Sequence, residues 1–261
     1  MSSSTRGIYV NRNGVWHPVE IPSVNVNGQW KDITKAYYNN NGTWQQFFPP
    51  TGSLAYTSPG VYYFTVPPGI FSVTASVYGA GGGGGGAILS GDKHGGGNGG
   101  SGGYVTNQTI ATVPNQNLAI IVGAGGPHGG GDLSAYLNGP GVTNGGIGGA
   151  SYISIGGVIQ VEATGGNGGW GSIGDNPPGG PSYTPFNGLP GGAAGSPNGV
   201  AGTQVANWME NRNTAGQGAQ AVNGTGYGSG GIGEDAVGSQ GAIIPGGSAS
   251  SGQDGAVFIS Y

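Results

Sequence analysis

The sequence Phe71-Ser-Val-Thr-Ala-Ser-Val-Tyr78 continues directly into Gly-Ala-Gly-Gly-Gly-Gly-Gly-Gly at positions 79–86, and this junction decides the fold. The first part is rich in β-branched and aromatic residues, as strands are. The second part suits neither a strand nor an α-helix, because glycine loses more conformational freedom on folding than any other residue. The sequence therefore predicts a strand that leads into a different kind of extended backbone.

Later glycine runs keep a three-residue period, for example Gly-Gly-Asn-Gly-Gly-Ser-Gly-Gly at 96–103. Three residues per turn is the period of the polyproline-II helix, which has no internal hydrogen bonds. Buried backbone groups must nevertheless find partners, so we expect glycine helices to pack closely and bond to one another, with the third residue on an outward face. The expected scaffold positions include Gly81, Gly84, Gly99, Gly102, Gly148 and Gly168.

Composition leaves a disordered chain and a folded glycine-rich chain as alternatives. Glycine (64) and proline (17) make up roughly 31% of the 261 residues, a share typical of disorder. Hydrophobic residues still make up 35% and charged residues only 6%, whereas disordered chains are poor in the former and rich in the latter. We expect a folded, mostly irregular and all-β protein with essentially no α-helix, the one weak helical candidate being 204–211.

Charge and hydropathy exclude several classes of function. The six basic residues are scattered and the net charge is −4, so no basic stripe can neutralise nucleic-acid phosphates. No run of 18 apolar residues is present, so we expect no transmembrane helix and no membrane insertion. The chain starts without the apolar core of a signal peptide. It also lacks cysteine, which removes disulfides and cysteine-bound zinc.

Three 14-residue repeats of the form Asn-x-Asn-Gly-x-Trp occupy the first 48 positions. Asn-Gly between apolar residues is a strong hairpin signal, because a type I′ turn needs positive φ at both central residues. The sequence predicts three small hairpins, each with a tryptophan two residues after the turn. Val19, Ile33 and Phe47 follow the tryptophans at a fixed offset, and we expect them to share the tryptophan face. The repeated residues are Asn13, Asn27, Asn41, Trp16, Trp30 and Trp44.

These tryptophans have two alternative roles, which can coexist. They could form the core of the module, since a single two-stranded hairpin cannot bury its own apolar face. Alternatively, three equivalent units around a pseudo-threefold axis could cap the end of a trimer, with one tryptophan presented to each partner chain. A module of this size without disulfides is marginally stable unaided, which favours docking.

The remaining chain divides into a short linker and a large domain. Pro-Pro-Thr-Gly-Ser at 49–53 indicates a stiff linker, so we assign residues 1–48 to the repeat module and 54–261 to a glycine-rich domain. Strands in this domain are expected at 61–66, 71–78, 104–122, 150–161 and 255–261.

The order of tryptophan repeats, strand, polyglycine and loops resembles the tip adhesins of the long tail fibres of T-even-type bacteriophages. The resemblance includes the Val-Tyr-Gly-Ala-Gly-Gly stretch from Val77 and the closing Asp254-Gly-Ala-Val-Phe-Ile-Ser-Tyr261. It implies a polyglycine-II sandwich whose glycine runs alternate with variable loops that bind a host outer-membrane protein, often a porin. It further implies one adhesin copy docked by its N-terminus on the trimeric distal fibre subunit, and hence a location on the virion.

The interruptions between glycine runs are the expected receptor-binding loops, because loops on a rigid scaffold carry function. Aromatic residues, Met and Arg are enriched at interfaces, whereas the alternative is that each aromatic residue covers an edge of the lattice. The candidates are Lys93, His94, His128, Tyr136, Leu137, Trp170, Tyr183, Phe186, Trp208, Met209, Arg212 and Glu234.

Enzymatic motifs occur only as by-products of the glycine content. Gly-x-Gly-x-x-Gly at 79–84 follows a strand but precedes no helix that could bind a pyrophosphate. Gly-Gly-Ser-Gly-Gly at 99–103 lacks the strand-turn-helix context of a nucleophile. We therefore expect no enzyme, no cofactor and no metal. The alternative to an adhesin is a structural or surface-adsorbing glycine-rich protein of the ice-binding or cell-wall type.

Overall fold

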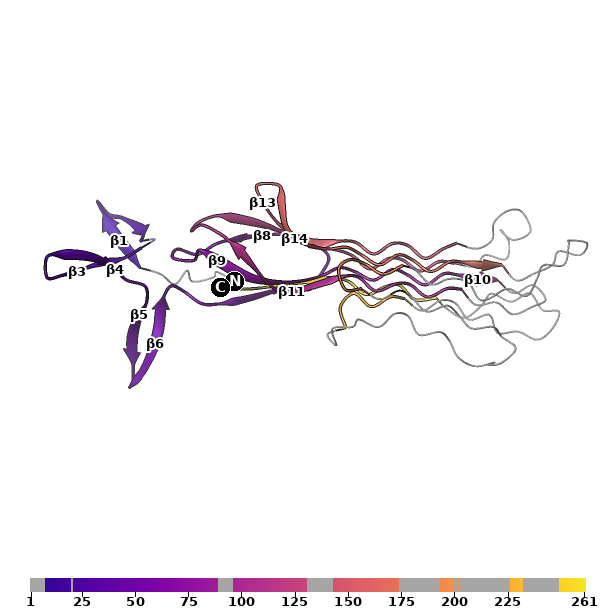
Figure 1. Cartoon of the computed structure of the whole chain (residues 1–261), viewed down its shortest axis with the longest axis horizontal. Helices are drawn as coiled ribbons and strands as arrows, with labels where there is room; N and C mark the ends of the chain where they lie inside the picture. The colour runs from indigo at the N-terminus through magenta and orange to yellow at the C-terminus, as the bar shows by residue number, and fades with distance from the viewer. Residues whose placement is uncertain are drawn as a thin grey trace, which may run out of the picture.

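The computed structural model (Figure 1) describes three parts in order along the long axis: three hairpins, a β-sandwich and a bundle of extended glycine rods. The described residues contain strands and no helix, which confirms the predicted fold class. The weak helical candidate at 204–211 lies outside them. The structure describes residues 8–19, 21–88, 96–130, 143–173, 193–199, 201, 226–231 and 249–261.

The three predicted hairpins are present, and each is a separate two-stranded antiparallel sheet. Their turns have positive φ at both central residues, with 53° at Asn13 and 86° at Gly14 in the first. In each hairpin an earlier asparagine side chain accepts a hydrogen bond from the turn glycine, as Asn11 does from Gly14 at 2.9 Å. The strands are β1 (Tyr9–Arg12) with β2 (Val15–Pro18), β3 (Ser23–Val26) with β4 (Gln29–Asp32), and β5 (Ala36–Asn40) with β6 (Thr43–Phe48).

Two four-stranded antiparallel sheets form the sandwich. One has the order β11-β9-β16-β7 and the other β14-β13-β12-β8. The strands are β7 (Ser53–Tyr56), β8 (Gly60–Thr65), β9 (Ser72–Tyr78), β11 (Tyr104–Ala111), β12 (Asn117–Val122), β13 (Ser151–Ile155), β14 (Val158–Ala163) and β16 (Ala256–Ser260).

The strand predictions were correct in place but too coarse in two stretches. Residues 104–122 form two strands separated by a turn at Asn115, and the stretch predicted at 150–161 is a hairpin that turns at Gly156 and Gly157. The core lies between the sheets, where Leu118, Ile120 and Ile153 are fully buried. Alternation along β12 produces this burial, because successive side chains point to opposite faces.

The sandwich also holds the predicted linker. Gly52 and Tyr261 exchange two backbone hydrogen bonds, of 2.9 and 3.0 Å, and β7 pairs with β16 immediately afterwards. The C-terminal strand therefore fixes the segment that leads into the glycine-rich domain. This strand addition could not be read from 49–56 alone, because its partner is about 200 residues away in the sequence.

Residues 79–86 form the central rod of a lattice of glycine-rich rods. All eight of their N–H groups donate to neighbouring carbonyls at 2.8–3.1 Å. Successive N–H groups donate to three different antiparallel runs in turn, so each of these runs accepts a hydrogen bond from every third residue of 79–86. The carbonyls of 80–84 accept bonds from three further, parallel runs. The antiparallel runs are 96–103, 143–150 and 249–255, and the parallel runs are 123–130, 164–170 and 226–231.

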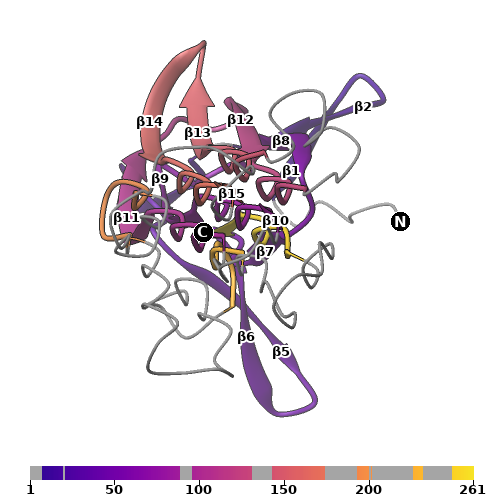
Figure 2. The same ribbon diagram turned by 90° about the vertical axis from the view of Figure 1, so that its right-hand side faces the viewer.

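These six runs also bond to one another in a closed ring around the centre, as between Gly148 N–H and Gly166 O at 2.9 Å. Figure 2 shows the rods end-on, lying side by side. The three-residue period of the sequence is therefore the period at which a rod returns to the same hydrogen-bond partner. The lattice predicted from the glycine runs is confirmed in the described residues. Beyond two of the rods, β10 (Ala87–Ile88) and β15 (Ser172–Ile173) pair in parallel.

The outward placement of the third residue holds for some rods and fails for one. Ile147 and Trp170 are 69% and 54% exposed, as expected. Asn98 and Ser101 are instead fully buried, because the run 96–103 is covered on its outer side. Part of that cover is the run 193–199, whose Gly195 N–H donates to the Ser101 carbonyl at 2.8 Å.

Two tyrosines in the sandwich give a pH prediction. Burial raises the pKa of Tyr78, and charge repulsion from Tyr104 adds to it. Burial and Tyr261 raise the pKa of Tyr56 in the same way. Because the pKa is raised in the folded state, the tyrosines of the unfolded chain ionise first as the pH rises. The two tyrosines therefore contribute their full share to the free energy of unfolding below pH of about 10, and this share is lost as the pH rises further.

We expect the midpoint of thermal unfolding to fall above pH of about 10, and Tyr78→Phe to reduce that fall. Circular dichroism melts between pH 8 and 11.5 measure both effects. An identical alkaline fall in the variant would contradict the role of Tyr78.

Candidate functional site

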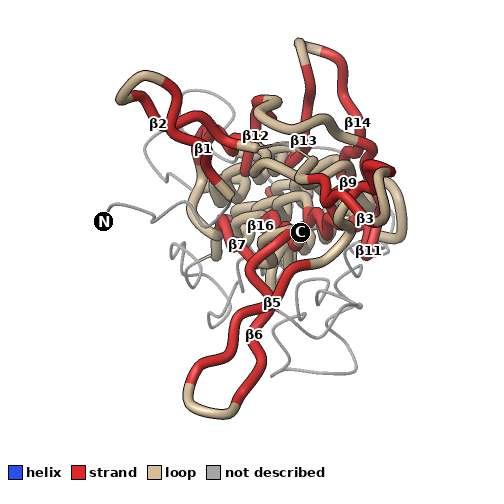
Figure 3. Tube along the Cα trace, turned by 90° about the vertical axis from the view of Figure 1, so that its left-hand side faces the viewer, coloured by secondary structure: helices blue, strands red, loops and turns tan. Residues whose placement is uncertain are grey.

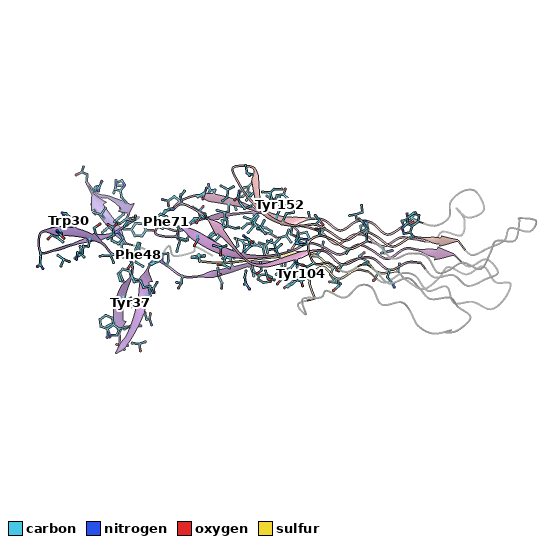
Figure 4. All side chains as sticks on the ribbon, viewed as in Figure 1. Trp30, Tyr37, Phe48, Phe71, Tyr104 and Tyr152 are labelled. Carbon is cyan, nitrogen blue, oxygen red and sulfur yellow. The ribbon has the colours of Figure 1, made fainter. Side chains whose placement is uncertain are left out.

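The three repeat tryptophans are the most exposed aromatic side chains of the hairpin module. Trp16, Trp30 and Trp44 are 65%, 74% and 67% exposed, and each lies opposite an asparagine of the paired strand. Such exposure argues against the alternative that they form the core of the module. Figure 4 shows Trp30 on the hairpin that points away from the sandwich.

The residues that follow the tryptophans do not share their surroundings. Val19, Ile33 and Phe47 are half-buried, whereas the tryptophans are open to solvent. An offset of three residues is odd, and successive side chains of a strand alternate between its faces. The expectation of a shared face was wrong for this reason.

Further apolar side chains extend the exposed surface of the module. Large exposed apolar patches often mark sites of interaction with other proteins. The hairpins splay apart in three different directions (Figures 1 and 3), so each presents its own apolar surface. The additional exposed residues are Tyr9, Val10, Val15, Ile21, Val24, Val26, Tyr37 and Tyr38.

The base of the module is packed against the sandwich. Phe48 is 4% exposed, and a Cβ at Gly69 would lie 2.7 Å from its ring. Gly69 also has φ of 82°, a conformation that glycine adopts readily. Figure 4 places Phe48 and Phe71 at this junction. The third hairpin is therefore held by buried contacts, whereas its tip is free.

The opposite end of the molecule is where most predicted receptor loops leave the lattice. The rods run away from the sandwich and return to it, and the segments 89–95, 131–142, 174–192 and 232–248 join outgoing runs to returning runs. Lys93, His94, Tyr136, Leu137, Tyr183, Phe186 and Glu234 belong to these segments and lie outside the described residues.

Two of the predicted loop residues are described, and both lie on rods. Trp170 is 54% exposed at the last turn of the run 164–170. His128 is exposed on the run 123–130, and its Nδ1 lies 2.9 Å from the Gly129 carbonyl oxygen.

The segment that carries Trp208, Met209 and Arg212 differs from the other four in where the described residues on either side of it lie. These three residues lie outside the described ones. On one side, Tyr104 N–H donates to the Pro197 carbonyl at 2.7 Å, and on the other the Tyr227 ring lies 6.2 Å from that of Tyr78. Both flanks therefore lie at the sandwich end of the lattice, opposite to the flanks of the other four segments.

The scaffold glycines occupy the rods themselves. A Cβ at Gly81, Gly99, Gly102, Gly148 or Gly168 would overlap a backbone carbonyl of a neighbouring rod. Gly84 donates to Ser250 O at 3.0 Å and accepts from Gly129 N–H at 2.8 Å. The first five positions therefore exclude side chains, and none of the six glycines can supply a side-chain group to a ligand.

The described residues form neither a metal centre nor a membrane-spanning helix. Within the described ranges, no group of three or more His, Asp or Glu side chains gathers as a metal centre would require. Among the same residues, no helix is long and apolar enough to span a membrane.

Comparison with known proteins is consistent with the glycine lattice. No curated protein matches the chain. The family model for a glycine-rich domain matches residues 57–261, which include the whole lattice and all but the first strand of the sandwich. The chain therefore belongs to the glycine-rich domain family.

Proposed function

We propose that the protein is a non-enzymatic receptor-binding adhesin at the distal tip of a bacteriophage long tail fibre. Its hairpin module docks on the trimeric distal subunit of the fibre, and its far-end loops bind an outer-membrane protein of the host, of porin type. The observation that carries the proposal is the set of three equivalent hairpins, each with an exposed tryptophan, at the end of the molecule away from the glycine rods.

The proposed docking on the fibre is supported by the match between three equivalent hairpins and the three identical subunits of the partner. One chain with three equivalent units can present the same contact to each of three identical subunits, so one adhesin suffices for each fibre tip. Exposed tryptophans are the residues most enriched in interface hot spots. The first 48 residues also carry four of the six basic residues, whereas eight of the ten acidic residues follow them. A moderately acidic fibre end would complement the module.

The recognition half rests on rigidity and low charge. A lattice whose backbone groups bond to one another holds loop ends at fixed positions, which limits the ordering cost of binding. With only 6% charged residues, the chain recognises its receptor by shape and aromatic contact more than by charge.

Adsorption of the purified protein to bacteria tests this proposal. We expect binding to cells that display the matching outer-membrane protein, no binding to an isogenic strain that lacks it, and less than about a tenfold change in affinity between 50 and 200 mM salt. Equal adsorption to both strains would favour the surface-adsorbing alternative. A thousandfold loss with salt would contradict recognition by shape.

A further inference from the structure

We propose that the side of the lattice carries a binding site for a neutral hexopyranose, formed by Trp170, Asn167, Asn144 and Ile147 on two adjacent rods. We call these four residues the lattice-side platform. The inference goes beyond the proposed function because its ligand is a saccharide, its position is the side of the rods, and it needs none of the loops.

The four residues lie together because of the lattice register. Asn167 and Trp170 are three residues apart on one rod, and Asn144 and Ile147 are three apart on the next, so each pair shares one face of its rod. The two rods are bonded through Gly145 N–H to Gly169 O at 2.8 Å and Gly148 N–H to Gly166 O at 2.9 Å. All four side chains are exposed.

The polar groups of the platform are placed to bind hydroxyl groups. Asn144 Oδ1 accepts a hydrogen bond from Gly171 N–H at 2.8 Å, which orients its amide NH₂ group for another acceptor. No partner within the described part of the chain engages the Asn167 side-chain amide, which is exposed. Two amides beside an indole offer donors and acceptors without charge.

The aromatic group supplies the apolar contact. The indole of Trp170 is 54% exposed, and a flat aromatic face attracts the C–H groups on one face of a pyranose ring. Ile147, 69% exposed, adds a second apolar side chain one turn further along the adjoining rod, opposite Asn167 in the register of the two rods. A pyranose has this same division into an apolar face and a rim of hydroxyls.

The side chains at the exposed positions distinguish these two rods from the adjoining rod. A Cβ at Gly145, Gly148, Gly166 or Gly169 would overlap backbone atoms, so only the outward positions can carry functional groups. The adjoining run 123–130 exposes Ala124, Pro127 and Gly130, which offer no side-chain hydrogen bond, and its one exposed polar side chain, His128, already lies 2.9 Å from the Gly129 carbonyl oxygen. Within the lattice residues that the structure describes, no Lys or Arg lies near the platform, so an anionic lipid or phosphate ligand is disfavoured.

Indole N–H signals provide a direct test, because the chain contains five tryptophans and each gives one signal. The full chain, labelled with ¹⁵N-tryptophan, is titrated with the methyl α-pyranosides of glucose, galactose and mannose up to 100 mM. The Trp170 signal is assigned from its loss in Trp170→Phe. We expect it alone to shift, with a dissociation constant on the order of 1–10 mM.

One platform variant and one control variant separate a loss of saccharide binding from a loss of folding and from receptor binding. We expect Asn167→Ala to weaken the saccharide affinity at least about tenfold, whereas Tyr63→Ala, which truncates an aromatic residue 74% exposed on the sandwich, leaves it unchanged. The proposal is overturned if no indole signal moves, if another tryptophan responds instead, or if Asn167→Ala binds as tightly as wild type. Adsorption to cells lacking the outer-membrane protein is measured separately, so failure of either proposal is recognised on its own.

Discussion

Gly83→Ala is expected to unfold the glycine-rich domain, with a loss of at least about 4–5 kcal/mol of stability. A Cβ at this position would overlap the backbone carbonyl of Pro127, and a backbone atom cannot move aside as a flexible side chain can. The central rod would have to shift, which breaks bonds to several rods at roughly 0.5–1.5 kcal/mol each. Chemical denaturation followed by circular dichroism, together with limited proteolysis, measures the loss.

Gly130→Ala is the matched control for this prediction. Gly130 lies on an outer rod, where a Cβ would meet nothing within 4 Å, and its φ is outside the positive region. Alanine there restricts the unfolded chain without a clash, so we expect no loss and a gain of up to about 1 kcal/mol. Equal stability of the two variants would show that the rods are not packed as the lattice requires.

The lattice could be predicted because its rule is local. A rod with three residues per turn returns to the same neighbour every third residue. In a Gly-Gly-X run, the sequence therefore predicts that the two glycines of each triplet face other rods. The central position of 79–86 could not be assigned in the same way, because the hydrogen bonds that surround this run join it to segments far apart in the sequence. The sequence does not indicate which outward positions are covered by a further rod. Asn98 and Ser101 occupy such positions and are buried.

The sandwich was less predictable because its pairings are distant in sequence. β16 lies between β7 and β9, and neither Ser53–Tyr56 nor Ala256–Ser260 carries a signal for the other. The candidate docking surface illustrates the same limit. The repeat predicts the hairpins and their tryptophans, but a tryptophan in a small module suits a core as well as an interface. Only the folded arrangement exposes Trp16, Trp30 and Trp44 together.

Replacing all three repeat tryptophans with alanine is expected to abolish the proposed docking on a trimeric fibre subunit while the glycine-rich domain stays folded. The side chains are exposed in the free chain, so their removal costs little stability. Truncating a tryptophan hot spot costs 2 kcal/mol or more, so three together should weaken docking at least about a thousandfold. Size-exclusion chromatography and calorimetry with the purified subunit measure affinity and stoichiometry.

The single variants decide whether docking follows the threefold repeat. If each hairpin contacts one subunit, Trp16→Ala, Trp30→Ala and Trp44→Ala should weaken docking by similar factors, at one copy of this chain per three subunits. Tyr63→Ala, exposed to the same degree as Trp30 but on the sandwich, should dock normally. A loss confined to one hairpin would indicate one-sided docking, and unchanged affinity of the triple variant would refute docking through the tryptophans. Equal losses are expected because the three turns share one geometry, with φ of 53°, 53° and 49° at their asparagines.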